Sequence, residues 1–131
     1  MTRTVLVVED TQACAATLEL ALAAIPGVSV SLAPTAALAL RILRGDDPQI
    51  HAVVTDLNLP AIDGFELIRT IRADPRHARV PIIVTSADTD PRTPARTYEL
   101  GADAYFAKPY SPALVRQKVE QLLNANRSSD P

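Results

Sequence analysis

The sequence predicts an α/β protein in which helices cover both faces of a parallel sheet. Short apolar runs alternate with longer amphipathic stretches along the 131 residues, and this alternation is typical of a chain that returns through a helix after each strand. Most of the apolar runs contain no alternating polar residues, as expected for strands buried on both faces. Glycine and proline residues separate the segments, which indicates where the elements end.

Five strands are expected, and one of them differs from the others. Its side chains alternate between apolar and polar, so residues 28–32 fit a half-covered strand near the sheet edge. Pro81 stands at the first position of the fourth strand, where a missing N–H group is tolerated. The expected strands are residues 5–8, 28–32, 52–55, 81–84 and 104–107. Joined by right-handed crossovers, they give a doubly wound sheet.

Five helices are expected between and after the strands. Thr35 is placed to cap the second helix, and Ser111-Pro112 is a typical helix start. The expected helices are residues 11–24, residues 35–44, a segment carrying Phe65, Ile68 and Ile71, a segment from about Pro94 to Gly101, and a segment after Ser111 that stacks Val115, Val119 and Leu122 inward. We expect one domain over residues 1–123 and a polar tail or linker stump over residues 124–131.

The composition predicts a cytoplasmic domain that binds neither nucleic acid nor membrane. The net charge is -2 and the basic residues are scattered, whereas nucleic-acid recognition needs a basic surface. No apolar run approaches the roughly 20 residues of a membrane span. The single Cys14 fits a reducing compartment, and its helical spacing to Leu18 and Leu22 predicts a small core residue. His51 and His77 fall in loop-like sequence and are expected at the surface.

The carboxyl ends of four predicted strands carry polar residues of related chemistry. Open α/β sheets form their sites just beyond these ends. The four strands lead in turn to Glu9-Asp10, Asp56, Ser86-Ala87 and Lys108-Pro109. The sequence therefore predicts that three carboxylates, one hydroxyl and one ammonium group meet at one edge of the sheet.

Three carboxylates at one edge require compensating positive charge. Two like charges 4 Å apart repel by about 4 kcal/mol at an effective dielectric constant near 20. A partly hydrated Mg²⁺ would relieve this repulsion, and Lys108 would supply a second cation. Ser86 can donate a hydrogen bond to a phosphoryl oxygen, and the small Ala87 leaves room for that group. Asp56 is therefore a candidate nucleophile toward phosphorus.

Each of these features has an ordinary structural explanation when taken alone. An acidic pair after a strand is more often a helix N-cap, and Asp56 could be another cap or a surface charge. Lys108-Pro109 could be only a turn, and Ser86 only a loop hydroxyl. Their occurrence at four strand ends in one topology favours a functional site.

The ordered set of motifs resembles the receiver family of two-component signalling over residues 4–123. The matching motifs are Val7-Val8-Glu9-Asp10, Thr55-Asp56-Leu57-Asn58-Leu59-Pro60, Asp63-Gly64, Pro81-Ile82-Ile83-Val84-Thr85-Ser86-Ala87, Gly101-Ala102-Asp103-Ala104-Tyr105 and Lys108-Pro109. The resemblance implies a flavodoxin-like sheet with the strand order 2-1-3-4-5.

The resemblance also implies a role for each matching residue. Asp56 would accept a phosphoryl group from a histidine of a kinase or phosphotransfer protein. Mg²⁺ would be bound by Asp10, Asp56, the backbone carbonyl of Asn58 and, through water, Glu9. The residues that bind the phosphate or change position with it would be Ser86, Ala87, Tyr105 and Lys108. Gly64 would support the turn after the third strand, and a cis peptide bond would precede Pro109.

By the same resemblance the protein would be a signalling switch that modifies itself and is no conventional enzyme. Phosphorylation would alter the surface of the fourth helix, fifth strand and last helix, and so regulate a target or an output domain outside this chain. The resemblance also allows a dimer that forms on phosphorylation. Two departures from the family pattern stand out: Ser86 replaces the commoner threonine, and Pro91 with Pro94 makes the fourth-helix region unusual.

Three other functions share parts of this pattern. A flavin-binding flavodoxin shares the fold, but Glu9-Asp10 would repel the phosphate in its first loop. A haloacid-dehalogenase-type phosphatase needs a second aspartate two residues after the nucleophile, where this chain has Asn58. A receiver-like binding module that no longer cycles phosphate stays open, although the residues needed for the cycle are present.

Overall fold

The computed structural model describes residues 2–128 and contains one five-stranded parallel sheet. The strands are β1 (Arg3–Val8), β2 (Val28–Ala33), β3 (Ile50–Asp56), β4 (Ile82–Ser86) and β5 (Ala104–Ala107). Their order in the sheet is β2-β1-β3-β4-β5, and all four strand pairs are parallel. The fold class and strand order predicted from the sequence are confirmed.

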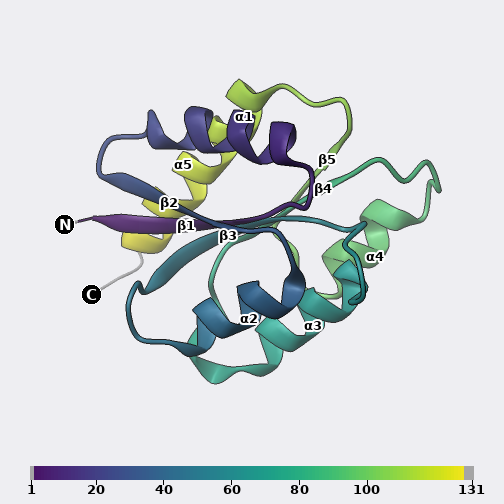
Figure 1. Ribbon diagram of the computed structural model, residues 1–131, viewed down its shortest axis with the longest axis horizontal. Coiled ribbons are helices and arrows are strands. Elements are labelled where there is room, and N and C mark those ends of the chain that lie inside the picture. Colours follow the sequence, from purple (N-terminus) through teal and green to yellow (C-terminus); the bar gives the residue numbers. More distant parts are fainter. Residues whose placement is uncertain (1, 129–131) are drawn as a thin grey trace.

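Helices cover both faces of the sheet (Figure 1). They are α1 (Gln12–Ala23), α2 (Ala36–Arg44), α3 (Gly64–Ala73), α4 (Thr93–Glu99) and α5 (Pro112–Ser128). α1 and α5 lie on one face, and α2, α3 and α4 lie on the other. A short 3-10 turn, η1 (Pro75–His77), follows α3 and was not predicted. No helix in the described part of the chain is long and apolar enough to cross a membrane.

Two apolar clusters, one on each face of the sheet, form the core. In β1, Leu6 and Val8 point into the cluster under α2 and α3, whereas Val5 and Val7 point into the cluster under α1 and α5. Successive side chains of a strand face opposite sides of the sheet. The unbroken apolar runs in the sequence are therefore explained by strands with a helical layer on each face.

Local sequence signals explain where several elements begin. The Thr35 hydroxyl accepts a hydrogen bond from the Leu38 amide and caps α2, as predicted. The Asp63 carboxylate accepts one from the Phe65 amide and caps α3. A Cβ atom on Gly64 would lie 2.5 Å from the Leu57 Cα atom, so only glycine fits where α3 begins beneath the end of β3. The role of Gly64 in the turn after the third strand stays a prediction.

Several side chains lie elsewhere than predicted. His77 is buried because it ends the η1 turn, which packs against the body. His51 is half-buried, and its Nδ1 accepts a hydrogen bond from the Thr4 amide. Cys14 is half-buried rather than part of the core. In α5 the fully buried residues after Val115 repeat at every fourth position and include Leu123, while Leu122, predicted to point inward, is partly buried and packs against the same cluster.

The last helix is also longer than predicted. α5 continues to Ser128, so residues 124–128, predicted to belong to a polar tail or linker stump, are helical. The remaining tail residues, 129–131, lie outside the described part of the chain. The domain boundary at residue 123 stays a prediction.

Candidate functional site

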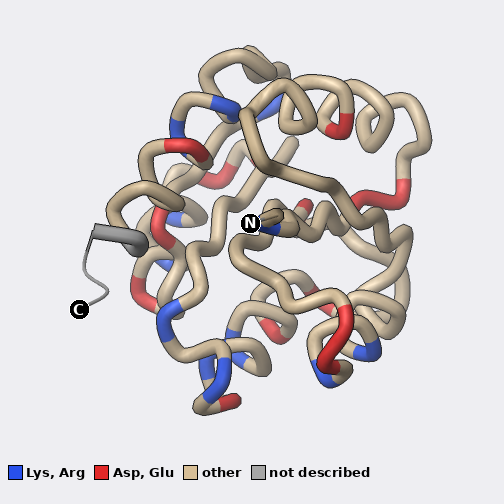
Figure 2. The backbone as a smooth tube through the Cα atoms, turned by 90° about the vertical axis from the view of Figure 1, so that its left-hand side faces the viewer, with Lys and Arg blue, Asp and Glu red and all other residues tan. Residues whose placement is uncertain are grey.

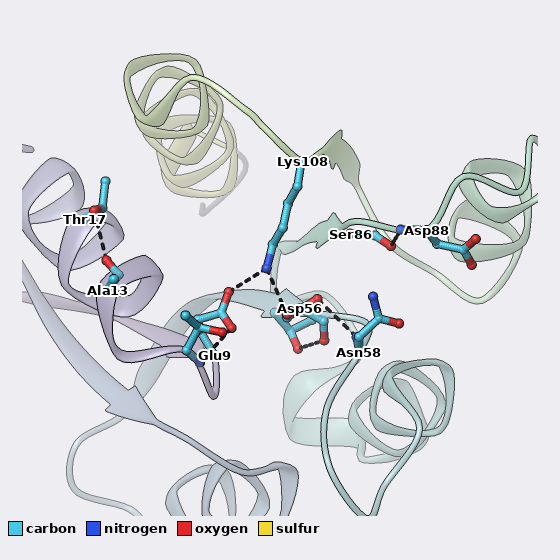
Figure 3. Close-up of polar contacts among 10 residues, drawn as sticks. Glu9, Ala13, Thr17, Asp56, Asn58, Ser86, Asp88 and Lys108 are labelled. Carbon is cyan, nitrogen blue, oxygen red and sulfur yellow. Dashed lines mark hydrogen bonds and ion pairs between the residues drawn. The ribbon is translucent and has the colours of Figure 1, made fainter.

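The carboxyl ends of β1, β3, β4 and β5 bring the predicted polar side chains to one edge of the sheet. Glu9 directly follows β1, Asp56 and Ser86 are the last residues of β3 and β4, and Lys108 directly follows β5. Figure 3 shows the Lys108 side chain reaching down from the end of β5 between Glu9 and Asp56. Residues 99 positions apart in the sequence are thus in direct contact.

A buried cluster of charges forms the centre of the site. The Lys108 Nζ atom donates to Glu9 Oε1 at 2.9 Å and to Asp56 Oδ2 at 3.0 Å. The side chains of Glu9, Asp56 and Lys108 are only 1%, 5% and 20% exposed. Buried charges of this kind are stable only when their remaining hydrogen-bonding atoms also find partners.

Backbone amides supply those partners. The Thr11 amide donates to Glu9 Oε2, and the Asn58 amide donates to Asp56 Oδ1, both at 3.1 Å. Both oxygens of each carboxylate are therefore engaged. The site holds two carboxylates in fixed orientations at the ends of two neighbouring strands.

Burial and charge shift the pKa values of the cluster. Burial raises the pKa of Glu9, and the hydrogen bonds from Lys108 and Thr11 offset this only in part. For Lys108, burial alone would lower the pKa, but the hydrogen bonds to Glu9 and Asp56 outweigh it and raise the pKa above its usual value. The Lys108 ammonium group therefore remains charged at neutral pH.

The donor set fits a hard divalent cation. Carboxylate oxygens of Glu9, Asp10 and Asp56 all lie within 4.8 Å of one another. Asp10 is exposed, whereas the other two are buried. A cation could therefore enter the site from solvent on the side of Asp10. An open hollow of about 600 Å³, lined in part by Asp10, Asn58 and Asp88, leads to this edge. Oxygen ligands and room for water are what Mg²⁺ requires.

The residues predicted to respond to phosphate lie around this cluster. Ser86 is fully buried, and its hydroxyl accepts a hydrogen bond from the Asp88 amide at 2.9 Å. Figure 3 shows this hydroxyl directed toward Asp88 rather than toward Asp56. Ala87 is exposed beside it. Tyr105 is half-buried and packs against the cluster under α2 and α3. The Lys108-Pro109 peptide bond is cis, as predicted.

Sequence reasoning missed two residues next to the site, Asp88 and Thr93. Asp88 lines the hollow together with Asp10, and its carboxylate accepts a hydrogen bond from the Thr93 hydroxyl at 3.0 Å. The run Asp88-Thr89-Asp90-Pro91 could have indicated them. Aspartates at this spacing before a proline favour turns in which the aspartate side chain bonds the backbone two residues further on. The structure shows such turns, in which the Asp88 carboxylate also accepts from the Asp90 amide.

Comparisons with known proteins agree with this geometry. The family model described as "Response regulator receiver domain" matches residues 5–120. Protein RcaC of Microchaete diplosiphon is 43% identical over 58 residues, which are 44% of this chain and 9% of that protein. Chemotaxis protein CheY1 of Helicobacter pylori strain J99 is 30% identical over 74 residues, which are 56% of this chain and 60% of that protein. The matches thus span less than two thirds of the length of these curated relatives.

A solved structure is similar over nearly the whole chain. It is the signal receiver domain of a signal transduction histidine kinase from Syntrophus aciditrophicus, with a TM-score of 0.85 and 26% sequence identity. The similarity covers 98% of this chain and 96% of that one. With the family model matching most of the sequence and the charged cluster at the expected strand ends, the chain belongs to the response regulator receiver domain family of two-component signalling.

Proposed function

We propose that this receiver domain is a phosphorylation switch whose phosphoryl acceptor is Asp56. One observation carries the proposal: the Asp56 carboxylate is fixed at the end of β3 by Lys108 on one oxygen and by the Asn58 amide on the other. It also lies within reach of Glu9 and Asp10. A carboxylate that is already oriented beside a cationic group can attack phosphorus without first being ordered.

The donor would be a phosphohistidine of a histidine kinase or of a phosphotransfer protein. An Asp56 oxygen forms a bond to phosphorus as the phosphorus–nitrogen bond breaks, and the electron pair of that bond leaves with the histidine nitrogen. Mg²⁺, held by Asp10, Asp56, the Asn58 carbonyl and, through water, Glu9, would neutralise charge on the transferring group. Lys108 turns from the carboxylates to a phosphoryl oxygen, and the Ser86 hydroxyl donates to another.

The new phosphate would be detected through the elements beside it. Ser86 ends β4, and Tyr105 lies on the neighbouring strand, opposite Val84 in the register of β4 and β5. Movement of Ser86 toward the phosphate would open space for Tyr105 and alter the surface formed by α4, β5 and α5. That surface would bind a downstream target or output domain, or a second copy of the chain. In this proposal the domain binds neither nucleic acid nor a membrane. A cytoplasmic location fits its role.

The test is the mass of the intact protein after incubation with acetyl phosphate and Mg²⁺, with the Asp56→Asn variant in parallel. A single phosphoryl adduct that requires Mg²⁺ and is absent in the variant is the expected result. An adduct that persists in Asp56→Asn would show that another residue is the nucleophile. Absence of an adduct on the wild-type protein that does bind Mg²⁺ would favour a binding module that is not phosphorylated.

A further inference from the structure

Helix α4 is attached to the body in a way that sets it apart from the other helices. Its buried residues are Thr93, 5% exposed, and Thr97, fully buried. Helices on a protein surface normally bury a stripe of apolar side chains, as α2 and α3 do here. The inward face of α4 instead carries two threonine side chains, and only the Thr93 hydroxyl bonds a residue outside the helix.

The two buried threonines make different contacts. The Thr97 hydroxyl donates to the Pro94 carbonyl at 2.7 Å, a bond between two residues of α4 itself. The Thr93 hydroxyl donates to Asp88 Oδ2 at 3.0 Å, which ties the start of α4 to the preceding loop. Arg96 also lies 3.9 Å from the ring centre of Phe65 in α3, a cation–π contact that is weak at an exposed site.

Asp88 connects this tie to the candidate site. Its amide donates to the Ser86 hydroxyl oxygen at 2.9 Å, while its two carboxylate oxygens accept from the Asp90 amide and from Thr93. A continuous series of hydrogen bonds therefore runs from Ser86, at the end of β4, through Asp88 to the first turn of α4. Figure 3 shows Ser86 turned toward Asp88 and away from Asp56.

We propose that Asp88 is a positioning residue whose amide keeps the Ser86 hydroxyl in its resting position. Because Thr93 bonds the Asp88 carboxylate, the strength of this contact depends on the position of α4. The inference rests on the proposed function, in which Ser86 must bond a phosphoryl group on Asp56. To do so, the Ser86 hydroxyl has to leave the Asp88 amide, and the loop that Thr93 restrains has to move. By thermodynamic linkage, a contact that stabilises α4 in its resting position disfavours phosphorylation of Asp56. Phosphorylation weakens that contact by the same free energy.

The experiment compares Thr93→Val with two matched controls. Thr93→Val keeps the shape of the side chain but removes the bond to Asp88, Thr93→Ser retains the hydroxyl, and Thr97→Val removes the other buried hydroxyl of the same helix. The first measurement is hydrogen exchange of the Asp88 amide by NMR, without phosphodonor. Exchange should be about fivefold faster in Thr93→Val, the size expected for one hydrogen bond, and close to wild type in both controls.

The second measurement is the initial rate of phosphorylation by acetyl phosphate with Mg²⁺, which a purely structural role of Thr93 would not raise. We expect the rate to rise by about fivefold in Thr93→Val only. Unchanged Asp88 exchange in Thr93→Val, or equal increases in Thr97→Val, would overturn the proposal. So would faster exchange with an unchanged phosphorylation rate. A wild-type protein that takes up no phosphoryl group would instead refute the role of Asp56, while the exchange comparison would still decide whether Thr93 holds the Asp88–Ser86 contact.

Discussion

The sheet has a carboxyl edge, where its strands end, and an amino edge, where they begin. Each of these edges holds a half-buried cation, and the two cations are bound in different ways. At the carboxyl edge, Lys108 bridges the side chains of Glu9 and Asp56. At the amino edge, which faces the viewer in Figure 2, Arg72 of α3 is bound mainly by backbone carbonyls. Lysine is a mobile point charge, whereas arginine is a planar fork with five fixed donors.

The Arg72 guanidinium group has four partner residues, which lie in two separate segments, the one before β4 and the one before β5. It donates to the carbonyls of Gly101, His77 and Val80 at 2.7–3.0 Å, and to the Asp103 carboxylate at 3.0 Å. Asp103 in turn accepts from the Ile82 amide at the start of β4. Carbonyls cannot move without the chain that carries them, so this arrangement braces the fold. Lys108 is bound only by side chains, which leaves it free to change partner.

The largest effect is expected from Arg72→Met. Removal of the guanidinium group leaves several carbonyls and the Asp103 carboxylate without their donor, so stability should fall by about 3 kcal/mol. Urea unfolding measures this loss, and added Mg²⁺ should not restore it. Arg72→Lys should recover only part of it, because an ammonium group cannot reach all the carbonyls. A loss below about 1 kcal/mol would show that the brace is not structural.

Lys108→Met should have a smaller effect that depends on Mg²⁺. Without Lys108 the carboxylates at the carboxyl edge repel one another, and stability in EDTA should fall by about 2 kcal/mol. Because a cation bound only by the folded state stabilises it by mass action, Mg²⁺ should restore most of the loss. If Mg²⁺ rescued Arg72→Met equally, the contrast between the two edges would be wrong.

Backbone conformation provides a second contrast between the edges. At the amino edge, glycines occupy the left-handed positions, Gly27 at φ 75° and Gly101 at φ 112°. At the carboxyl edge, Ala61 adopts φ 69° in the loop after β3, a conformation that is unfavourable for a residue with a Cβ atom. Strain is therefore stored beside the site and avoided opposite to it.

Two substitutions with opposite signs test this contrast. Ala61→Gly should stabilise the protein by about 0.5 kcal/mol, because the gain from relieved strain exceeds the entropy cost of a new glycine. Gly101→Ala should destabilise it by about 1 kcal/mol or more, since its new Cβ atom would also meet the Arg72 side chain at 2.9 Å. Thermal unfolding of both variants is the measurement, and equal signs would refute the idea that strain lies at one edge only.

The difference between the edges also decides how much the sequence could predict. The strands were predictable because their apolar runs reflect two covered faces, and the charged cluster because each member directly follows a strand. The partners of Arg72 lie up to 31 residues away in sequence and are mostly carbonyls, which every residue carries, so no residue type marks them. The Asp88–Thr93 contact was missed for a related reason: it depends on where the loop places the start of α4.

The smallest effect is expected from His51, just inside the amino end of β3. Burial, together with the nearby Arg3 charge, lowers the pKa of His51, and its Nδ1 must be unprotonated to accept from the Thr4 amide. The unfolded chain therefore binds a proton more readily than the folded one, so stability falls as the pH drops through the unfolded pKa near 6.5. Because the ring is partly exposed, the loss should stay below about 1 kcal/mol.

The matched variant is His51→Asn, whose side-chain oxygen can accept the same hydrogen bond without titrating. Urea unfolding at about pH 7.5 and about pH 5.5 should show a larger loss on acidification for the wild type than for the variant. An identical pH dependence would mean that the Thr4 contact opens at no measurable cost. In that case the contact between His51 and Thr4 would add nothing measurable to the stability of the amino edge, which Arg72 and its carbonyl partners would still brace.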